Sequence, residues 1–240
     1  VVLIEKGYKS GEASAANAAF VWTITRKPGI DIRLAMHSLD LHLQLKEELD
    51  MDFEYVRNGG LLVIENEKQM PFVKAHVNKR TEDGFPLEII DAKQTLELEP
   101  LISKEKTIGA VYSPIDGTTN PIFLGVALNF QAQKLGAKVF YHTEVLDIEV
   151  EDRKVKGVKT NKGTIKTKTV VNAAGCWGYT IGAMVGLKVP ITPFQLAMLV
   201  TEQLPPCVFH PIMGASYMVE EDTGKEGGLG CGLIVSQQAS

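Results

Sequence analysis

The order of the strand and helix patterns constrains the fold more than any single motif. Residues 1–5, "VVLIE", form a short apolar run typical of a parallel strand that is covered on both faces. Strand–helix–strand patterns occur over residues 1–19 and 121–185, with a mixed region between them. The sequence therefore predicts an α/β fold, α+β overall, in which a parallel-sheet domain is interleaved with a mixed-sheet domain. We expect the first domain to comprise residues 1–45 and 118–190, and the second residues 46–117 and 191–240.

Individual elements follow from periodicity and from helix start and stop signals. A long amphipathic helix is expected after Pro28, and Pro121 starts a helix that Gly136 ends. Ser14 is the predicted N-cap of a short helix over residues 14–20. Further helices are expected over residues 67–80, 92–98 and 177–185. Strands are expected over residues 53–56, 59–64, 87–90, 108–114, 138–142, 144–150, 154–160, 163–175 and 189–202, with residues 154–160 and 163–175 paired across a turn.

Composition excludes several classes of function. The net charge is −4, and Lys and Arg are scattered among Asp and Glu, so the chain lacks the basic footprint of a nucleic-acid-binding protein. No apolar run reaches the ~20 residues of a membrane span, which predicts no transmembrane segment. Cys176, Cys207 and Cys231 are too far apart for a metal-ligand pattern or a disulfide framework, which favours a cytoplasmic location. The chain begins in a strand pattern and without Met, so we expect a fragment.

Glu5 is the first candidate site residue. An acidic residue that closes the second strand of a dinucleotide-binding unit accepts hydrogen bonds from ribose hydroxyls. The Gly-rich turn that accompanies it would lie before Val1. The alternative is an ordinary surface carboxylate.

Two stretches rich in small residues form the other candidates. In "GEASAANAAF", residues 11–20, the N–H groups at the start of a helix could bind a pyrophosphate. The alternative is an Ala-rich helix that packs on a sheet. "TVVNAAGCWG", residues 169–178, is expected to end a strand in residues small enough for a flat ring to approach. The alternative is close helix–strand packing. Trp177 is expected to form a cavity wall.

Together these stretches resemble the FAD-dependent amine oxidoreductases of the D-amino-acid oxidase superfamily, such as glycine oxidase, the sarcosine oxidase β-subunit and D-amino-acid dehydrogenase. The resemblance is carried by "VVLIEKG", "GEASAANAAF" and the long stretch from "DGTTNPIF" to "VVNAAGCW", and extends to about residue 206. It implies an FAD-binding Rossmann-like domain and a substrate domain. The chain departs from the family pattern in two respects. The N-terminal G-x-G-x-x-G is absent from these residues, and Ala19 stands where Gly is usual.

The resemblance also implies roles for particular residues. Glu5 would bind the adenosine ribose, and Ser14 and Asn17 would lie along the pyrophosphate and flavin. Val145 would offer backbone N–H and C=O groups to the adenine, although an apolar core role is equally compatible. Tyr217, expected on a strand of the substrate domain, could reach a substrate carboxylate. The full set of implied cofactor-binding residues is Glu5, Lys6, Ser14, Asn17, Ala18, Val145, Ala173, Ala174, Gly175 and Trp177.

The implied reaction is oxidation of the C–N bond of a small amino acid or N-methyl amino acid by hydride transfer to FAD. No catalytic base and no metal ligand are assigned. The alternatives are alcohol oxidation of the glycerol-3-phosphate dehydrogenase type and a non-catalytic subunit of a multi-chain flavin dehydrogenase. If the protein is a dehydrogenase, a partner subunit that accepts the electrons is expected. The dispersed Arg residues do not favour the phosphate-binding alternative.

Overall fold

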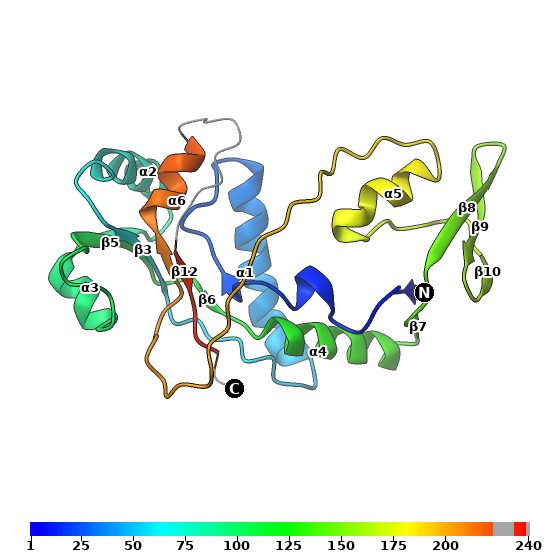
Figure 1. Ribbon diagram of the computed structural model, residues 1–240, viewed down its shortest axis with the longest axis horizontal. Helices are drawn as coiled ribbons and strands as arrows, with labels where there is room; N and C mark the ends of the chain where they lie inside the picture. The colour runs from blue at the N-terminus through cyan, green and yellow to red at the C-terminus, as the bar shows by residue number, and fades with distance from the viewer. Residues whose placement is uncertain (223–232, 239–240) are drawn as a thin grey trace. The chain divides into compact units, whose positions relative to one another are not determined.

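The computed structural model describes residues 1–222 and 233–238 and divides the chain into two compact units (Figure 1). Unit 1 comprises residues 1–16 and 125–199, and unit 2 comprises residues 17–124 and 200–240. Each unit is therefore discontinuous in sequence. The boundaries differ from those expected, mainly because residues 17–45 belong to unit 2. The assignment of the units to cofactor and substrate binding stays a prediction.

Unit 1 contains a short parallel sheet and an antiparallel one. β1 (Val2–Ile4) pairs in parallel with β7 (Lys138–Phe140). β8 (Val145–Glu151), β9 (Lys154–Thr160) and β10 (Gly163–Lys166) form an antiparallel sheet in the order β10-β9-β8. The expected pairing across residues 161–163 is confirmed, because Gly163 lies opposite Thr160. The 3-10 helices η1 (Glu12–Ser14) and η2 (Gly175–Trp177) and the short α5 (Gly178–Ala183) complete this unit.

Unit 2 is built on a mixed five-stranded sheet. The strand order is β12 (Ile234–Val235), β11 (Ile212–Gly214), β3 (Gly60–Ile64), β5 (Gly109–Ser113) and β4 (Glu88–Asp91). β3 pairs in parallel with β11 and antiparallel with β5. All five residues of β3 are buried, as expected for a central strand with both faces covered.

Alternation along the strands divides the core of unit 2 between the two sheet faces. Leu62 and Val111 pack with α2 (Met70–Glu82) and α6 (Ala215–Asp222), whereas Leu61 and Ala110 pack with Leu98 of α3 (Ala92–Leu98). Figure 1 shows α2 and α6 on one side of this sheet and α3 on the other. Burial of each large aliphatic side chain contributes roughly 1.5–3 kcal/mol. The predicted combination of a parallel pair and a mixed sheet in an α/β fold is confirmed.

Apart from the short helix expected over residues 14–20, the predicted helices agree with the structure to within small shifts at their ends. α1 (Ile30–Glu48) follows Pro28, and α3 begins with a capping box between Asp91 and Gln94. α4 (Pro121–Lys134) starts at Pro121, and Gly136 beyond its end has a φ of 90°. That left-handed conformation is the one in which glycine commonly ends a helix.

Five predicted elements are wrong. Residues 167–174 and 189–202 are not strands, because neither stretch pairs with another strand in residues 1–222 and 233–238. Residues 53–56 make only an isolated bridge, between Val56 and Thr118, and do not pair with β3. Ser14 ends η1 instead of capping a helix, and residues 20–21 form β2 (Phe20–Val21), which pairs with β6 (Gly117–Thr118). Tyr217 lies on α6 and not on a strand.

From the sequence we expected neither a disulfide framework nor a membrane-spanning segment. Cys176 and Cys207 are free, and Cys231 lies outside the described residues. Within the part of the chain that the structure describes, no helix is both long enough and apolar enough to cross a bilayer.

Candidate functional site

Glu5 directly follows β1, as the sequence predicts, and its main chain is held on both sides. Its N–H donates to the carbonyl of Phe140 (2.9 Å), and its carbonyl accepts from the N–H of Thr143 (2.9 Å). Carboxylate oxygen Oε1 accepts from the N–H of Gly7 at 2.6 Å. Among the described residues, Oε2 has no hydrogen-bond donor. The carboxylate is therefore fixed in orientation and retains acceptor capacity for a ligand hydroxyl.

Lys6 and Trp177 are brought together within unit 1. The Nζ of Lys6 lies 3.8 Å from the centroid of the Trp177 ring, which is a cation–π contact. Trp177 is 37% exposed, so one part of its ring remains open to a ligand. Two of the predicted cofactor residues, 171 positions apart in the sequence, thus form one contact.

Val145 begins β8, which is an edge strand in the order β10-β9-β8. Its partner in β9 is Thr160, and the register is irregular between Val145 and Asp147. Within the described chain, the edge of β8 that faces away from β9 has no partner strand. An unpaired strand edge offers N–H and C=O groups, which are the groups that an adenine ring requires.

The loop before η1 contains a buried hydroxyl that the protein does not satisfy. Ser10 has a φ of 51°, and its Oγ is buried without a hydrogen-bond partner among the described residues. Gly125 of α4 faces this hydroxyl, and a Cβ at that position would collide with it. Ser14, the predicted phosphate donor, is exposed at the end of η1. A buried hydroxyl without a partner in this loop fits a site completed by a polar ligand.

Residues 172–175 form a turn instead of a strand end. The Oδ1 of Asn172 accepts from the N–H of Ala174 at 3.3 Å, and its Nδ2 donates to the carbonyl of Gly178 at 2.8 Å. Ala173 is exposed, Ala174 is half-buried and Gly175 has a φ of 54°. The small residues therefore lie at an accessible turn that leads into η2.

In unit 2, Asn17 shapes the following residues. Its Oδ1 accepts from the N–H of Ala19 at 2.9 Å, and Ala19 has a φ of 62°. Ala19 therefore adopts the left-handed conformation that glycine takes without strain. The carbonyl of Ala18 accepts from the Oγ of Ser236 at 2.8 Å. The residues after Asn17 are thus tied to two distant parts of unit 2, because the carbonyl of Ala19 also accepts from Thr119.

Asp116 is a structural residue that the sequence patterns did not identify. It is fully buried, and its Oδ2 accepts from the N–H groups of Thr23 (2.9 Å) and Ile24 (3.3 Å). Its Oδ1 accepts from the Oγ1 of Thr23 at 2.5 Å. Burial raises the pKa of the Asp116 carboxyl, and these hydrogen bonds lower it in part. The carboxylate fixes the segment that follows β2.

A cavity of about 310 Å³ lies beside this segment in unit 2. Its lining includes Phe20, Trp22, Arg26, Ser38 and His42. Arg26 donates from Nε to the carbonyl of Trp22 at 3.3 Å, and its Nη1 lies 3.9 Å from the Oδ1 of Asp31. Asp31 also lines the cavity, so an incoming carboxylate would share the guanidinium of Arg26 with Asp31.

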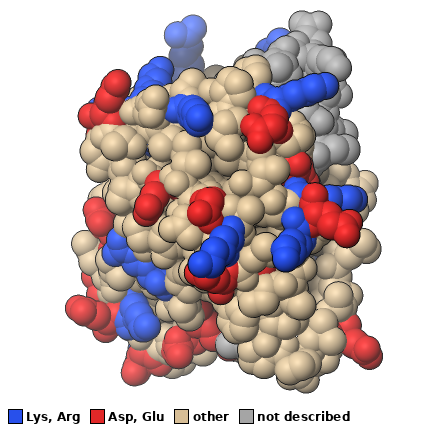
Figure 2. Space-filling view, turned by 90° about the vertical axis from the view of Figure 1, so that its left-hand side faces the viewer, with Lys and Arg blue, Asp and Glu red and all other residues tan. Residues whose placement is uncertain are grey.

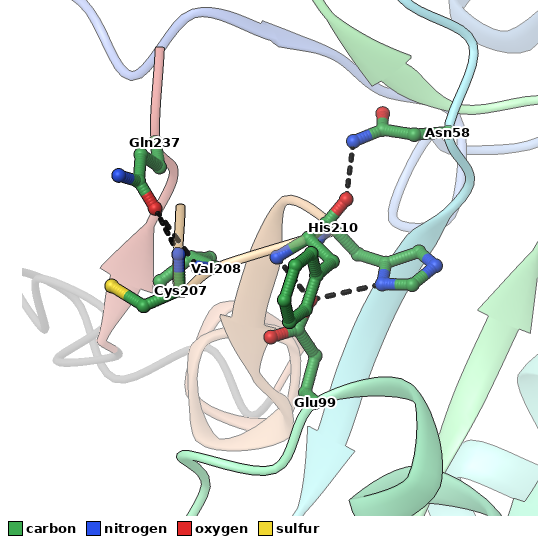
Figure 3. A network of polar contacts seen from close by, with 7 residues as sticks. Asn58, Glu99, Cys207, Val208, His210 and Gln237 are labelled. Atoms are coloured by element: carbon green, nitrogen blue, oxygen red, sulfur yellow. Dashed lines mark hydrogen bonds and ion pairs between the residues drawn. The ribbon is translucent and has the colours of Figure 1, made fainter. Parts of the chain in front are cut away.

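A second buried carboxylate holds the segment before β11 (Figure 3). The Oε1 of Glu99 accepts from the N–H groups of Phe209 (2.7 Å) and His210 (2.5 Å) and contacts the Nδ1 of His210 at 2.9 Å. Asn58 donates to the carbonyl of Phe209. Gln237 forms a second group of contacts, in which its Oε1 accepts from the N–H groups of Cys207 and Val208 (Figure 3). The sequence patterns did not identify either residue, because Glu99 holds groups about 110 positions away and Gln237 holds groups about 30 positions away.

Tyr217 is partly buried, and its ring packs against the core of unit 2 on α6. A contact with a substrate carboxylate stays a prediction.

Basic and acidic side chains are mixed on the surface. Figure 2 shows one face of the molecule, on which basic and acidic side chains are interspersed. On β8 and β9, Lys159 is paired with Asp147 and Glu149. No group of His, Cys, Asp and Glu side chains in the described residues could hold a metal ion.

Comparison with known proteins identifies several relatives. Mitochondrial sarcosine dehydrogenase of Homo sapiens is 30% identical over 209 residues, which are 85% of this chain and 23% of that protein. Glycine oxidase of Geobacillus kaustophilus is 30% identical over 201 residues, which are 81% of this chain and 53% of that protein. The crystal structure of glycine oxidase from Geobacillus kaustophilus has a TM-score of 0.76 at 26% identity, over 89% of this chain and 59% of that one.

The chain thus spans between about a quarter and about half of the length of these relatives. A family model described as FAD dependent oxidoreductase, DAO, matches residues 1–227. This match includes all ten predicted cofactor residues. The chain therefore belongs to the DAO family of FAD-dependent oxidoreductases.

Proposed function

We propose that the protein uses FAD to oxidise the C–N bond of a small amino acid or N-methyl amino acid. The observation that carries this proposal is the family match over residues 1–227, in which Glu5 closes β1 with an oriented carboxylate. Relatives named sarcosine dehydrogenase, glycine oxidase and D-amino acid dehydrogenase support this substrate class.

The residues of unit 1 fit the adenosine and pyrophosphate parts of FAD. The Oε2 of Glu5 is available for ribose hydroxyls, and the open edge of β8 at Val145 is available for adenine. The buried Oγ of Ser10 lacks a partner among the described residues, and Ser10 directly precedes the stretch 11–20, which the resemblance places near the pyrophosphate. Lys6 and Trp177 form a contact at the same unit's small-residue turn. These features support binding of the cofactor by this chain.

In unit 2 the proposed contacts are with the flavin and the substrate. Asn17 and Ala18 would lie along the flavin, in a segment that Ser236 and Thr119 hold in place. Arg26 would bind the substrate carboxylate in the cavity that begins at Phe20. We assign this role to Arg26 because its guanidinium lines the cavity and its ion pair with Asp31 is long, at 3.9 Å.

FAD supplies the electron acceptance, so the chain's own residues need only bind, orient and shield the substrate. A positioned substrate gains rate from proximity and from exclusion of water. No general base is assigned, because a neutral amine requires none before the C–H bond breaks.

The proposal is tested with the natural full-length protein, purified and examined for an oxidised-flavin absorption spectrum. Sarcosine, dimethylglycine, glycine, D-alanine and L-proline are then added anaerobically, with glycerol 3-phosphate as the alternative substrate. Bleaching of the flavin by an amino acid supports the proposal. Bleaching only by glycerol 3-phosphate, or a purified protein without flavin, contradicts it. Reoxidation of the bleached flavin by air would distinguish an oxidase from a dehydrogenase that needs a partner.

A second candidate is a non-catalytic subunit of a larger assembly. Pyruvate dehydrogenase phosphatase regulatory subunit of Mus musculus is 29% identical over 182 residues, which are 76% of this chain and 21% of that protein. This relative carries a regulatory name at an identity close to that of the dehydrogenases. Bound FAD that no amine or alcohol reduces would favour this second candidate.

A further inference from the structure

The β9–β10 turn of unit 1 is joined to the connection between β7 and β8. The Oδ1 of Asn161 accepts from the N–H of Glu144 at 3.0 Å, and its Nδ2 donates to the carbonyl of His142 at 3.4 Å. The N–H of Asn161 also donates to the carbonyl of Glu144 at 3.1 Å. One side chain thus holds the residues on both sides of Thr143.

Lys162 makes a parallel contact from the same turn. Its Nζ donates to the carbonyl of Tyr141 at 2.8 Å, and the Oγ1 of Thr143 donates to that same carbonyl at 2.9 Å. Thr160, the residue before the turn, accepts at its Oγ1 from the N–H of Lys162 at 3.1 Å, which fixes the turn itself. The side chains of Asn161 and Lys162 therefore hydrogen-bond to three consecutive peptide units in the connection between β7 and β8.

The opposite side of this connection is bonded to the candidate ribose-binding residue. Thr143 donates its N–H to the carbonyl of Glu5, and His142 donates its N–H to the carbonyl of Gly7 at 3.2 Å. His142 has a φ of 50°, and Thr143 is buried. Residues 141–144 are thus held between the β9–β10 turn and the chain that carries the carboxylate of Glu5.

We propose that Asn161 and Lys162 are positioning residues for the adenosine end of FAD. This inference rests on the proposed function, because it takes Glu5 and Val145 as contacts of that end. The two side chains fix residues 141–144, which connect to Glu5 by hydrogen bonds and lead into Val145. They thereby set the separation between the ribose-binding carboxylate and the strand edge that faces adenine.

The energetic basis is preorganisation of the binding site. Residue 142 is left-handed, and a connection of this kind has other conformations available when its hydrogen bonds are removed. Ordering it during binding would then reduce the affinity for the cofactor. Each lost hydrogen bond of this type is expected to weaken FAD binding about five-fold. The flavin end, which Asn161 and Lys162 do not contact in this arrangement, would be unaffected.

The experiment compares ligands that contain adenosine with one that does not. Asn161→Ala and Lys162→Met are introduced into the natural full-length protein, and the apoprotein is titrated with FAD, ADP and FMN. Lys162→Met, which loses one side-chain hydrogen bond, is expected to bind FAD and ADP about five-fold more weakly, and Asn161→Ala, which loses two, up to about 25-fold more weakly. The affinity of both variants for FMN is expected to be unchanged. Asn66→Ala serves as the matched control, because the Oδ1 of Asn66 accepts from the N–H of Lys68 in an exposed turn of unit 2.

The possible results are distinct. Equal weakening of FAD, ADP and FMN would indicate a general loss of structure and would overturn the positioning role. Unchanged FAD and ADP affinities in both variants would also overturn it. Failure of the unmodified protein to bind FAD at all would refute the proposed function instead. When FMN binds too weakly to measure, a normal melting temperature together with weakened ADP binding supports the inference, and normal ADP binding contradicts it.

Discussion

Replacing Asp116 tests how strongly one buried carboxylate holds the segment after β2. In the native protein its two oxygens accept three hydrogen bonds, two from Thr23 and one from Ile24. Asp116→Ala leaves all three donors buried without an acceptor, and each such donor costs about 1–3 kcal/mol. We expect the free energy of unfolding to fall by at least about 3 kcal/mol, which is a large part of the ~5–15 kcal/mol that a domain has.

Asp116→Asn separates shape from charge. The amide oxygen can accept from both N–H groups, and the amide nitrogen can donate to the Oγ1 of Thr23, whose own proton then lacks an acceptor. We expect this variant to lose only about 1 kcal/mol. Asp91→Ala is the matched control, because Asp91 also accepts a backbone N–H but is exposed at the start of α3. Its expected cost is about 1 kcal/mol.

The pH dependence gives an independent test of the same carboxylate. Because burial raises the pKa of Asp116 in the folded state, the native protein binds this proton more tightly than the unfolded chain does. The stability from this group is therefore fully present below the unfolded-state pKa and is lost as the pH rises through the folded-state pKa. Asp116→Asn should remove that loss from the pH profile.

Urea unfolding followed by the fluorescence of the buried Trp22 and by circular dichroism measures these differences. Measurements at several pH values in the acid range report the titration. Equal costs for Asp116→Ala and Asp91→Ala would refute the reasoning, because they would show that burial adds nothing to the value of the carboxylate. A pH profile unchanged by Asp116→Asn would refute the assigned pKa direction.

Four further substitutions test the other named groups. Glu5→Ala should weaken FAD binding about ten-fold or more, as measured by titration of the apoprotein, because ribose hydroxyls would lose a charged acceptor; unchanged affinity would remove Glu5 from the site. Ala174→Leu should lower the flavin content more than the melting temperature, and the reverse result would make Ala174 a packing residue. Arg26→Gln should raise KM for an amino-acid substrate about ten-fold or more with little change in FAD affinity, and an unchanged KM would contradict carboxylate binding there. Glu99→Ala should lower the free energy of unfolding by about 2–4 kcal/mol in urea titrations, whereas a loss below 1 kcal/mol would show that its three contacts are replaced by water.

The elements that depend on local signals were predictable from the sequence. Asp91 caps α3, Pro121 starts α4 and Gly136 follows its end, and each of these signals acts within a few residues. The pairing of β9 with β10 was likewise predictable, because a short turn joins two alternating strands. In such cases the stabilising partner lies close by in the sequence.

The failed strand predictions have a different cause. Residues 167–174 and 189–202 contain β-branched and apolar residues, but a strand also needs a partner to hydrogen-bond, and propensity does not supply one. Among the described residues no strand lies beside either stretch, and Val171 is 84% exposed. Tyr217 was misplaced because the pattern around it does not distinguish a short helix from a strand.

The sequence indicated candidate site residues, whose role in binding stays a prediction, but it did not indicate their contacts. Glu5 stands at a strand end, where its position in the pattern indicated a function. The stacking of Lys6 on Trp177, the left-handed Ala19 and the hydrogen bonds of Asp116 depend on residues about 90 to 170 positions apart or on backbone angles. Short-range patterns do not contain that information.

The side chain of Gln237 has a consequence for the dynamics of the irregular segment that it contacts. In addition to accepting from Cys207 and Val208, it donates from Nε2 to the carbonyls of Leu204 and Pro205, both at 3.1 Å. Amide protons exchange with solvent only when their hydrogen bonds open. The amides of Cys207 and Val208 should therefore exchange slowly although they belong to no helix or strand. Their exchange should accelerate together, as one unit, when the single amide group about 30 residues away is removed.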